Sequence, residues 1–184
     1  MTLPKAEIPR VLALLRHAKS SWRDSELGDR DRPLNARGDR AGRLLAAYFA
    51  RQPPPDLVLC SSALRTRETF AHIARAYSAP PPVLMEDGLY LADARAIMQR
   101  IEAVPDSVEF LLVIGHNPGL HELASMLARH GTRRDRNRLA DKFPTGALAS
   151  FRSVGRWRDF AHAPLALTSY VTPHDLGGGA ETDD

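Results

Sequence analysis

Residues 11–17 read VLALLRH, five apolar residues followed at once by an arginine and a histidine. Two further runs have the same form. Residues 57–60 read LVLC and precede two serines, and residues 110–114 read FLLVI and precede a glycine and a histidine. Short continuous apolar runs are typical of strands that are buried on both faces, as in parallel sheets. The three runs therefore predict three parallel strands.

Helix-like stretches separate these runs. Residues 36–51 and 63–77 place apolar side chains at helical spacing. Asn35 and Asp93 are good N-cap residues, which predicts helix starts at residue 36 and, for a helix ending near residue 103, at residue 94. Pro118 is tolerated in the first turn of a helix that runs to about residue 129. Later strands are predicted at four further places: residues 83–85, 147–152, 157–160 and 165–171.

Alternating strands and helices predict one α/β domain of three layers, with a mostly parallel central sheet and helices on both faces. The length of 184 residues suits one such domain and is short for two. We expect the domain to span residues 1–174. Residues 175–184 are rich in glycine and acids, which predicts a flexible C-terminal tail.

The composition is that of a globular protein, with 43% hydrophobic and 26% charged residues. A net charge of +3 gives little reason to expect nucleic-acid binding. No apolar run approaches the roughly 18 residues of a membrane span, and the first residues lack a signal-peptide pattern. Cys60 is the single cysteine, which excludes an internal disulfide. We therefore expect a cytoplasmic protein that binds neither membranes nor nucleic acid.

Reactive side chains follow each of the three predicted strands. In open parallel sheets, ligands bind beyond the carboxyl ends of the strands, so Arg16, His17, Arg65 and His116 should converge there. Two arginines with no carboxylate at ligand spacing make a poor site for a metal ion. Arginine forks match phosphate oxygens, and an imidazole can attack phosphorus. The pattern predicts phosphoryl chemistry without a metal or other cofactor.

Four segments carry a more specific resemblance: LRHAKS at residues 15–20, SSALRTRET at 61–69, GHNP at 115–118 and TPHDL at 172–176. They resemble segments of the histidine phosphatase superfamily, also called phosphoglycerate-mutase-like, in its SixA-like phosphohistidine phosphatase branch. The resemblance implies a phosphoglycerate-mutase-like fold and a hydrolase whose nucleophile, His17, becomes a phosphohistidine. It implies that Arg16, Arg65 and His116 bind the phosphoryl oxygens. The implied substrate is a phosphorylated protein, such as a histidine-phosphotransfer domain, or a small phosphoester.

Two positions depart from the family pattern. Many members have a glycine after the nucleophile and an asparagine six positions beyond it, where this chain has Ala18 and Arg23. Arg23 either replaces that phosphate contact or points into solvent. The family's proton donor is an acid after the third strand, and Glu86 occupies the similar position. The alternative for Glu86 is a solvated turn acid.

Other interpretations stay open at this stage. A cysteine phosphatase is disfavoured because Arg65 lies one residue too near Cys60 for that chemistry and Arg67 one residue too far. A phosphate-binding module without turnover and a small-molecule phosphomonoesterase are further candidates, and a mutase is disfavoured by the short chain. Trp22 and the charged residues 23–32 are predicted to form the rim of the pocket. Residues 129–138, with five arginines, are predicted to be a solvated loop or a docking site for an acidic partner.

Overall fold

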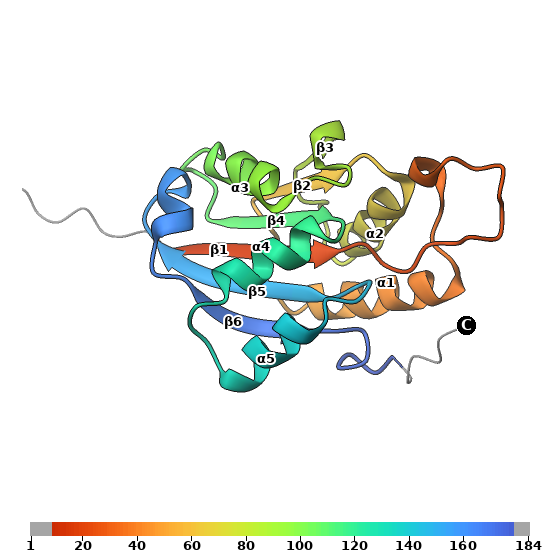
Figure 1. Cartoon of the computed structure of the whole chain (residues 1–184). Coiled ribbons are helices and arrows are strands. Elements are labelled where there is room, and N and C mark those ends of the chain that lie inside the picture. Colours follow the sequence, from red (N-terminus) through yellow and green to blue (C-terminus); the bar gives the residue numbers. More distant parts are fainter. Residues whose placement is uncertain (1–8, 179–184) are drawn as a thin grey trace, which may run out of the picture.

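The computed structural model describes residues 9–178, and its strands form one mixed sheet between two layers of helices (Figure 1). The strands are β1 (Pro9–Arg16), β2 (Leu57–Ser61), β3 (Val83–Glu86), β4 (Phe110–Gly115), β5 (Leu148–Val154) and β6 (Ala166–Val171). The α-helices are α1 (Ala36–Phe49), α2 (Leu64–Ala74), α3 (Ala94–Glu102), α4 (Gly119–Leu127) and α5 (Arg133–Asp141). Three 3₁₀ turns are η1 (Asp29–Asp31), η2 (Asp87–Leu89) and η3 (Trp157–His162).

Within these residues the strand order is β3-β2-β4-β1-β5-β6. Strands β3, β2, β4 and β1 pair in parallel, whereas β5 runs antiparallel to both β1 and β6. Arg16 lies opposite Gly115, and Cys60 lies opposite Ile114. The carboxyl ends of β1, β2 and β4 therefore meet at one edge of the sheet, and the predicted α/β class with a mostly parallel sheet is confirmed.

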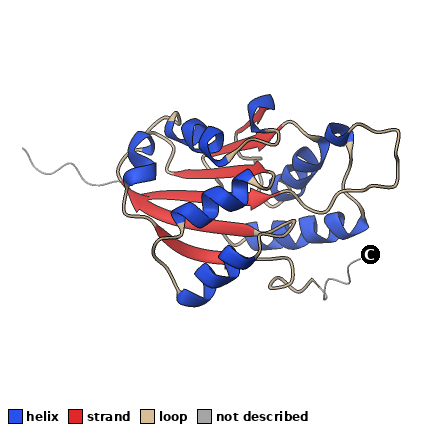
Figure 2. Ribbon diagram, in the orientation of Figure 1, coloured by secondary structure: helices blue, strands red, loops and turns tan. Residues whose placement is uncertain are grey.

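Helices cover both faces of the sheet (Figure 2). Along β1, Leu12 and Leu14 pack with α3, α4 and α5, while Ala13 and Leu15 pack with α1 and α2. This alternation follows from the strand geometry, in which successive side chains point to opposite faces. Because each face has its own apolar core, residues 11–15 of β1 are apolar without a break.

The predicted helix starts at Asn35 and Asp93 are confirmed. The Asn35 side chain accepts a hydrogen bond from the Gly38 amide, and the Asp93 carboxylate accepts one from the Ala96 amide. None of the helices in residues 9–178 is long and apolar enough to cross a membrane.

Two predicted elements are wrong. Residues 157–160 form the 3₁₀ turn η3 in place of a strand, because Trp157 and Phe160 both face the core and their rings lie 4.9 Å apart. A spacing of three residues on one face suits a 3₁₀ turn and not a strand. Residues 129–138 are not a continuous loop, since α5 begins at Arg133. Thr132 caps this helix by accepting a hydrogen bond from the Asp135 amide.

The predicted tail is described in part. The Asp175 carboxylate accepts hydrogen bonds from Thr172 and pairs with Arg138, and Leu176 packs against the core beside α1 and α2. Residues 179–184 lie outside the described part of the chain.

Candidate active site

The residues that follow β1, β2 and β4 line one cavity of about 310 Å³. Its lining consists of Arg16, His17, Lys19, Ser20, Trp22, Asp29, Arg32, Arg65, Leu91, His116, Asn117 and Thr145. The parallel pairing explains the convergence, because each of the three strands ends at the same edge of the sheet. The structure thus brings together the predicted set of two arginines and two histidines.

His17 is buried and has a defined hydrogen-bonding role. Its Nδ1 lies 2.8 Å from the carbonyl oxygen of Ala18, which can only accept, so Nδ1 carries the proton and Nε2 has the free lone pair. Burial lowers the pKa of His17 to about 3. The Ala18 hydrogen bond opposes this effect, and His116, Arg65 and Arg16 add to it. The ring is therefore neutral at pH 7 and presents Nε2 as a nucleophile.

His116 lies beside His17, with the two ring centroids 5.1 Å apart. Arg65 Nη2 is 3.4 Å from His116 Nδ1, and His116 Nε2 is 2.8 Å from the Ser61 hydroxyl oxygen. Because a guanidinium can only donate, Nδ1 accepts and Nε2–H donates to Ser61. Burial lowers the pKa of His116 to about 4, with Arg65 as the next largest cause. In this tautomer His116 is neutral.

Arg16 is joined to the loop that follows α5. Its Nη1 donates to the Phe143 carbonyl at 3.0 Å, and Asn117 donates to the same oxygen at 2.9 Å. The Gly146 amide then donates to the carbonyl oxygens of Arg16 and His17. Gly146 has φ of +77°, a conformation that glycine adopts without strain. This loop therefore fixes the end of β1, and it brings Thr145 into the cavity lining.

Asp29, from η1, is a cavity residue that sequence reasoning missed. Its carboxylate receives hydrogen bonds from Arg65 at 2.9 Å, from Arg32 at 2.6 Å and from the Tyr90 hydroxyl at 2.7 Å. The Tyr90 hydrogen bond is the largest cause that lowers the pKa of Asp29, to about 2. No local pattern separates Asp29 from the other acids of residues 23–32, and its partners come from three places in the chain. Only the tertiary structure identifies it.

Two of the predicted site residues do not line the cavity. Glu86 is paired with Arg100, whose Nε lies 2.9 Å from each Glu86 carboxylate oxygen. Arg23 is exposed outside the cavity lining. Its neighbour Trp22 does line the cavity at the predicted rim, and the Arg32 guanidinium stacks 3.1 Å from the ring centroid of Trp22.

Cys60 is fully buried on β2, and burial raises the pKa of its thiol to about 12. A protonated thiol outside the cavity is a poor nucleophile, which argues against the cysteine-phosphatase interpretation. Within residues 9–178, no three His, Cys, Asp or Glu side chains are grouped as metal ligands.

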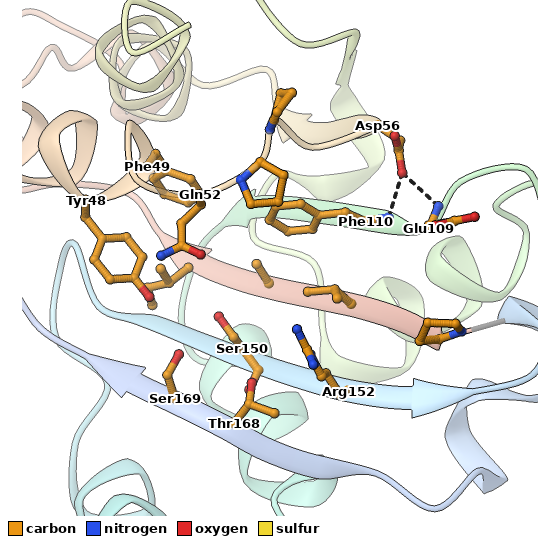
Figure 3. Close-up of a pocket in the computed structure, with 16 residues that line it drawn as sticks. Tyr48, Phe49, Gln52, Asp56, Glu109, Phe110, Ser150, Arg152, Thr168 and Ser169 are labelled. Atoms are coloured by element: carbon orange, nitrogen blue, oxygen red, sulfur yellow. Dashed lines mark hydrogen bonds between the residues drawn. The ribbon is translucent and has the colours of Figure 1, made fainter.

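A larger hollow of about 610 Å³ lies elsewhere, beside α1 on the face of β1, β5 and β6 (Figure 3). Ser150, Arg152 and Thr168 are among its lining residues, and Asp56 accepts hydrogen bonds from the Glu109 and Phe110 amides at its upper edge. Its lining contains no histidine and no buried charged side chain. The smaller cavity is therefore the better candidate for catalysis.

The sequence and the fold are similar to those of known proteins. Residues 12–90 match the model of the histidine phosphatase superfamily (branch 1). The chain is 38% identical over 162 residues to an uncharacterized protein of Mycobacterium tuberculosis, covering 86% of this chain and 99% of that one. It is also similar to a structure from Nakamurella multipartitia assigned as a phosphohistidine phosphatase SixA, with 30% identity and a TM-score of 0.78 over 90% of this chain and 96% of the other. A second similar structure, from Agrobacterium tumefaciens, is also assigned as SixA. It has 28% identity and a TM-score of 0.74 over 90% of this chain and 99% of that one.

Proposed function

The chain belongs to the histidine phosphatase superfamily. We propose that it is a phosphatase whose His17 takes a phosphoryl group from the substrate and passes it to water. The main support for this proposal is the state of the His17 side chain. Its Nε2 lone pair is free, its ring is neutral, and it lies in a cavity that Arg16 and Arg65 also line.

The reaction has two displacements. His17 Nε2 attacks phosphorus, a new N–P bond forms, and the bond from phosphorus to the leaving group breaks. Water then attacks the phosphohistidine, inorganic phosphate leaves, and His17 returns to its neutral form. Arg16 and Arg65 bind the phosphoryl oxygens and stabilise the charge that develops on them. His116 joins them when the bound anion favours a proton on its Nδ1, which then donates to a phosphoryl oxygen. A neutral imidazole needs no base to activate it.

The charge state of the carboxylates in and near the cavity favours a substrate in which phosphorus is bonded to nitrogen. Among the described residues that line the cavity, Asp29 alone carries a carboxylate, and its pKa of about 2 leaves it ionised. Glu86 is paired with Arg100 outside the cavity. An alkoxide leaving group needs a proton from an acid, whereas the ring of a phosphohistidine leaves as neutral imidazole when its other nitrogen already carries a proton. We therefore infer that the substrate is a protein phosphohistidine, for example on a histidine-phosphotransfer domain.

A comparison of substrates tests this function. We expect kcat/KM for a phosphorylated histidine-phosphotransfer domain to exceed that for an aryl phosphate. Arg65→Ala should lower it by on the order of 100-fold, because that change removes a donor to the phosphoryl group. Arg67→Ala is the matched control on the same helix. It is exposed outside the cavity, so its kcat/KM should stay within about twofold of the wild type.

Other results would identify the alternatives. Faster turnover of the aryl phosphate would indicate a general small-molecule phosphomonoesterase. Tight binding of phosphoprotein with no turnover of any substrate would indicate a phosphate-binding module.

A further inference from the structure

Both terminal nitrogens of the Arg65 guanidinium already donate to the same residue, Asp29. The Arg65 side chain is 4% exposed, and Nη1 donates to the Asp29 backbone carbonyl and Nη2 to the Asp29 carboxylate at 2.9 Å. The other hydrogen of Nη2 points to His116 Nδ1 at 3.4 Å. The fork with which an arginine grips two phosphate oxygens is therefore held by Asp29.

Asp29 is itself held firmly in place. Arg32 donates to one carboxylate oxygen at 2.6 Å, and the Tyr90 hydroxyl donates to the other at 2.7 Å. The Tyr90 ring packs edge-on against His116, with centroids 5.5 Å apart. These contacts come from the residues that directly follow η1 and η2 and from His116, which follows β4. The carboxylate thus lies in the cavity lining, on the arginine that a phosphoryl group needs.

We propose that Asp29 is an internal counter-anion that competes with phosphate for Arg65 and makes the site selective for phosphoryl groups presented by a protein. The inference rests on the proposed function, since it takes Arg65 to be a phosphate-binding residue. A phosphate dianion on Arg65 must displace part of the Asp29 contact, and the two anions then repel each other at short range.

This competition has a consequence for specificity. Free phosphate has only its own contacts with which to displace Asp29, so it binds weakly and product leaves readily. A phosphorylated protein adds contacts outside the cavity, and that additional binding energy can offset the loss of the Asp29 contact. Asp29 therefore lowers the affinity for free phosphate more than the reactivity toward a phosphoprotein.

Direct binding of inorganic phosphate tests the proposal without turnover. Calorimetric titration of the whole chain should show Asp29→Asn binding phosphate roughly tenfold more tightly than the wild type, as expected for removing one charge-assisted contact. Asp29→Ala should shift the affinity in the same direction. Asp31→Asn is the matched control, because Asp31 lies in the same turn, is exposed and does not line the cavity. Its affinity should stay within about twofold of the wild type.

Two results would overturn the proposal. If phosphate binds Asp29→Asn and the wild type equally, Asp29 does not compete with it. If binding becomes weaker, Asp29 instead orients Arg65 for the anion. The proposed function fails separately, if Arg65→Ala leaves phosphate binding unchanged in both the wild-type and the Asp29→Asn background.

Discussion

The proposed reactivity of His17 depends on one hydrogen bond and on burial. The Ala18 carbonyl fixes the proton on Nδ1, and burial keeps the ring neutral far below its ordinary pKa. A surface histidine would be partly protonated near pH 6.5 and would lose its nucleophilic lone pair. The strand end therefore supplies both the tautomer and the charge state that phosphoryl transfer needs.

Burial of His17 also makes the stability of the fold depend on pH. The unfolded chain takes up a proton at His17 near pH 6.5, whereas the folded protein does not until about pH 3. Between these values the unfolded state binds more protons, so the free energy of unfolding falls as the pH is lowered. The melting temperature should drop between pH 7.5 and pH 5, and His17→Asn should reduce that drop.

The control for this measurement is His162→Asn, at an exposed position outside the cavity lining. It should keep the wild-type pH dependence. An equal drop in melting temperature for His17→Asn and the wild type would contradict the link between burial and stability.

The sequence predicts some site residues and misses others for a physical reason. Arg16, His17, Arg65 and His116 were predictable because each follows a recognisable apolar strand or opens the next helix. Asp29 and Tyr90 were not, since they meet only through the path of a loop and a 3₁₀ turn. Glu86 lies at the expected strand end, but Arg100 on α3 binds it, and no sequence pattern reveals that pairing.

At the level of elements, strands were predicted best where they are buried on both faces. Strands β1, β2 and β4 could be predicted because such burial makes residues 11–15, 57–60 and 110–114 continuously apolar. Helix α5 was missed because it has one fully buried apolar residue, Leu139, and therefore little hydrophobic periodicity. The spacing of Thr132 and Asp135 resembles a capping box and was the available signal.

The close packing at the start of α4 should fix the position of His116, and a substitution at Gly119 can test this. Gly119 follows the segment that carries His116, and an added Cβ would overlap the Ala92 carbonyl oxygen and lie 2.9 Å from the Asp93 backbone. Gly119→Ala should therefore push α4 away, destabilise the fold by about 1–3 kcal/mol and lower activity. Chemical denaturation with a parallel activity assay measures both effects.

Gly88→Ala is the matched substitution, because a Cβ at Gly88 meets nothing within 4 Å. It should change the free energy of unfolding by less than about 0.5 kcal/mol. If the two variants behave alike, the close packing of α4 on the turn before α3 does not control the position of His116.

At the scale of the whole molecule, α5 carries exposed positive charge outside the cavity lining. Arg133 and Arg134 are exposed in its first turn, where positive charge opposes the helix dipole. Helix stability therefore does not explain the presence of these two arginines. We propose that they attract an acidic phosphoprotein. Raising salt should lower kcat/KM for such a protein more than for an aryl phosphate, since screening weakens long-range attraction.

Replacing both arginines with serine should narrow that difference in salt sensitivity while the activity toward the aryl phosphate stays the same. Stopped-flow or steady-state kinetics at two ionic strengths are sufficient. If salt lowers the wild-type kcat/KM equally for both substrates, α5 does not contribute to partner binding.

Identifying the phosphorylated atom shows directly whether His17 is the nucleophile. The enzyme is mixed with a phosphohistidine protein, quenched in alkali and analysed by mass spectrometry and phosphorus NMR. The account predicts an acid-labile, alkali-stable phosphoenzyme carrying phosphate on Nε2 of His17, because Nδ1 is blocked by its hydrogen bond to Ala18. The label should be absent from His17→Ala. Phosphate on Nδ1, on another residue, or still present in His17→Ala would contradict the account.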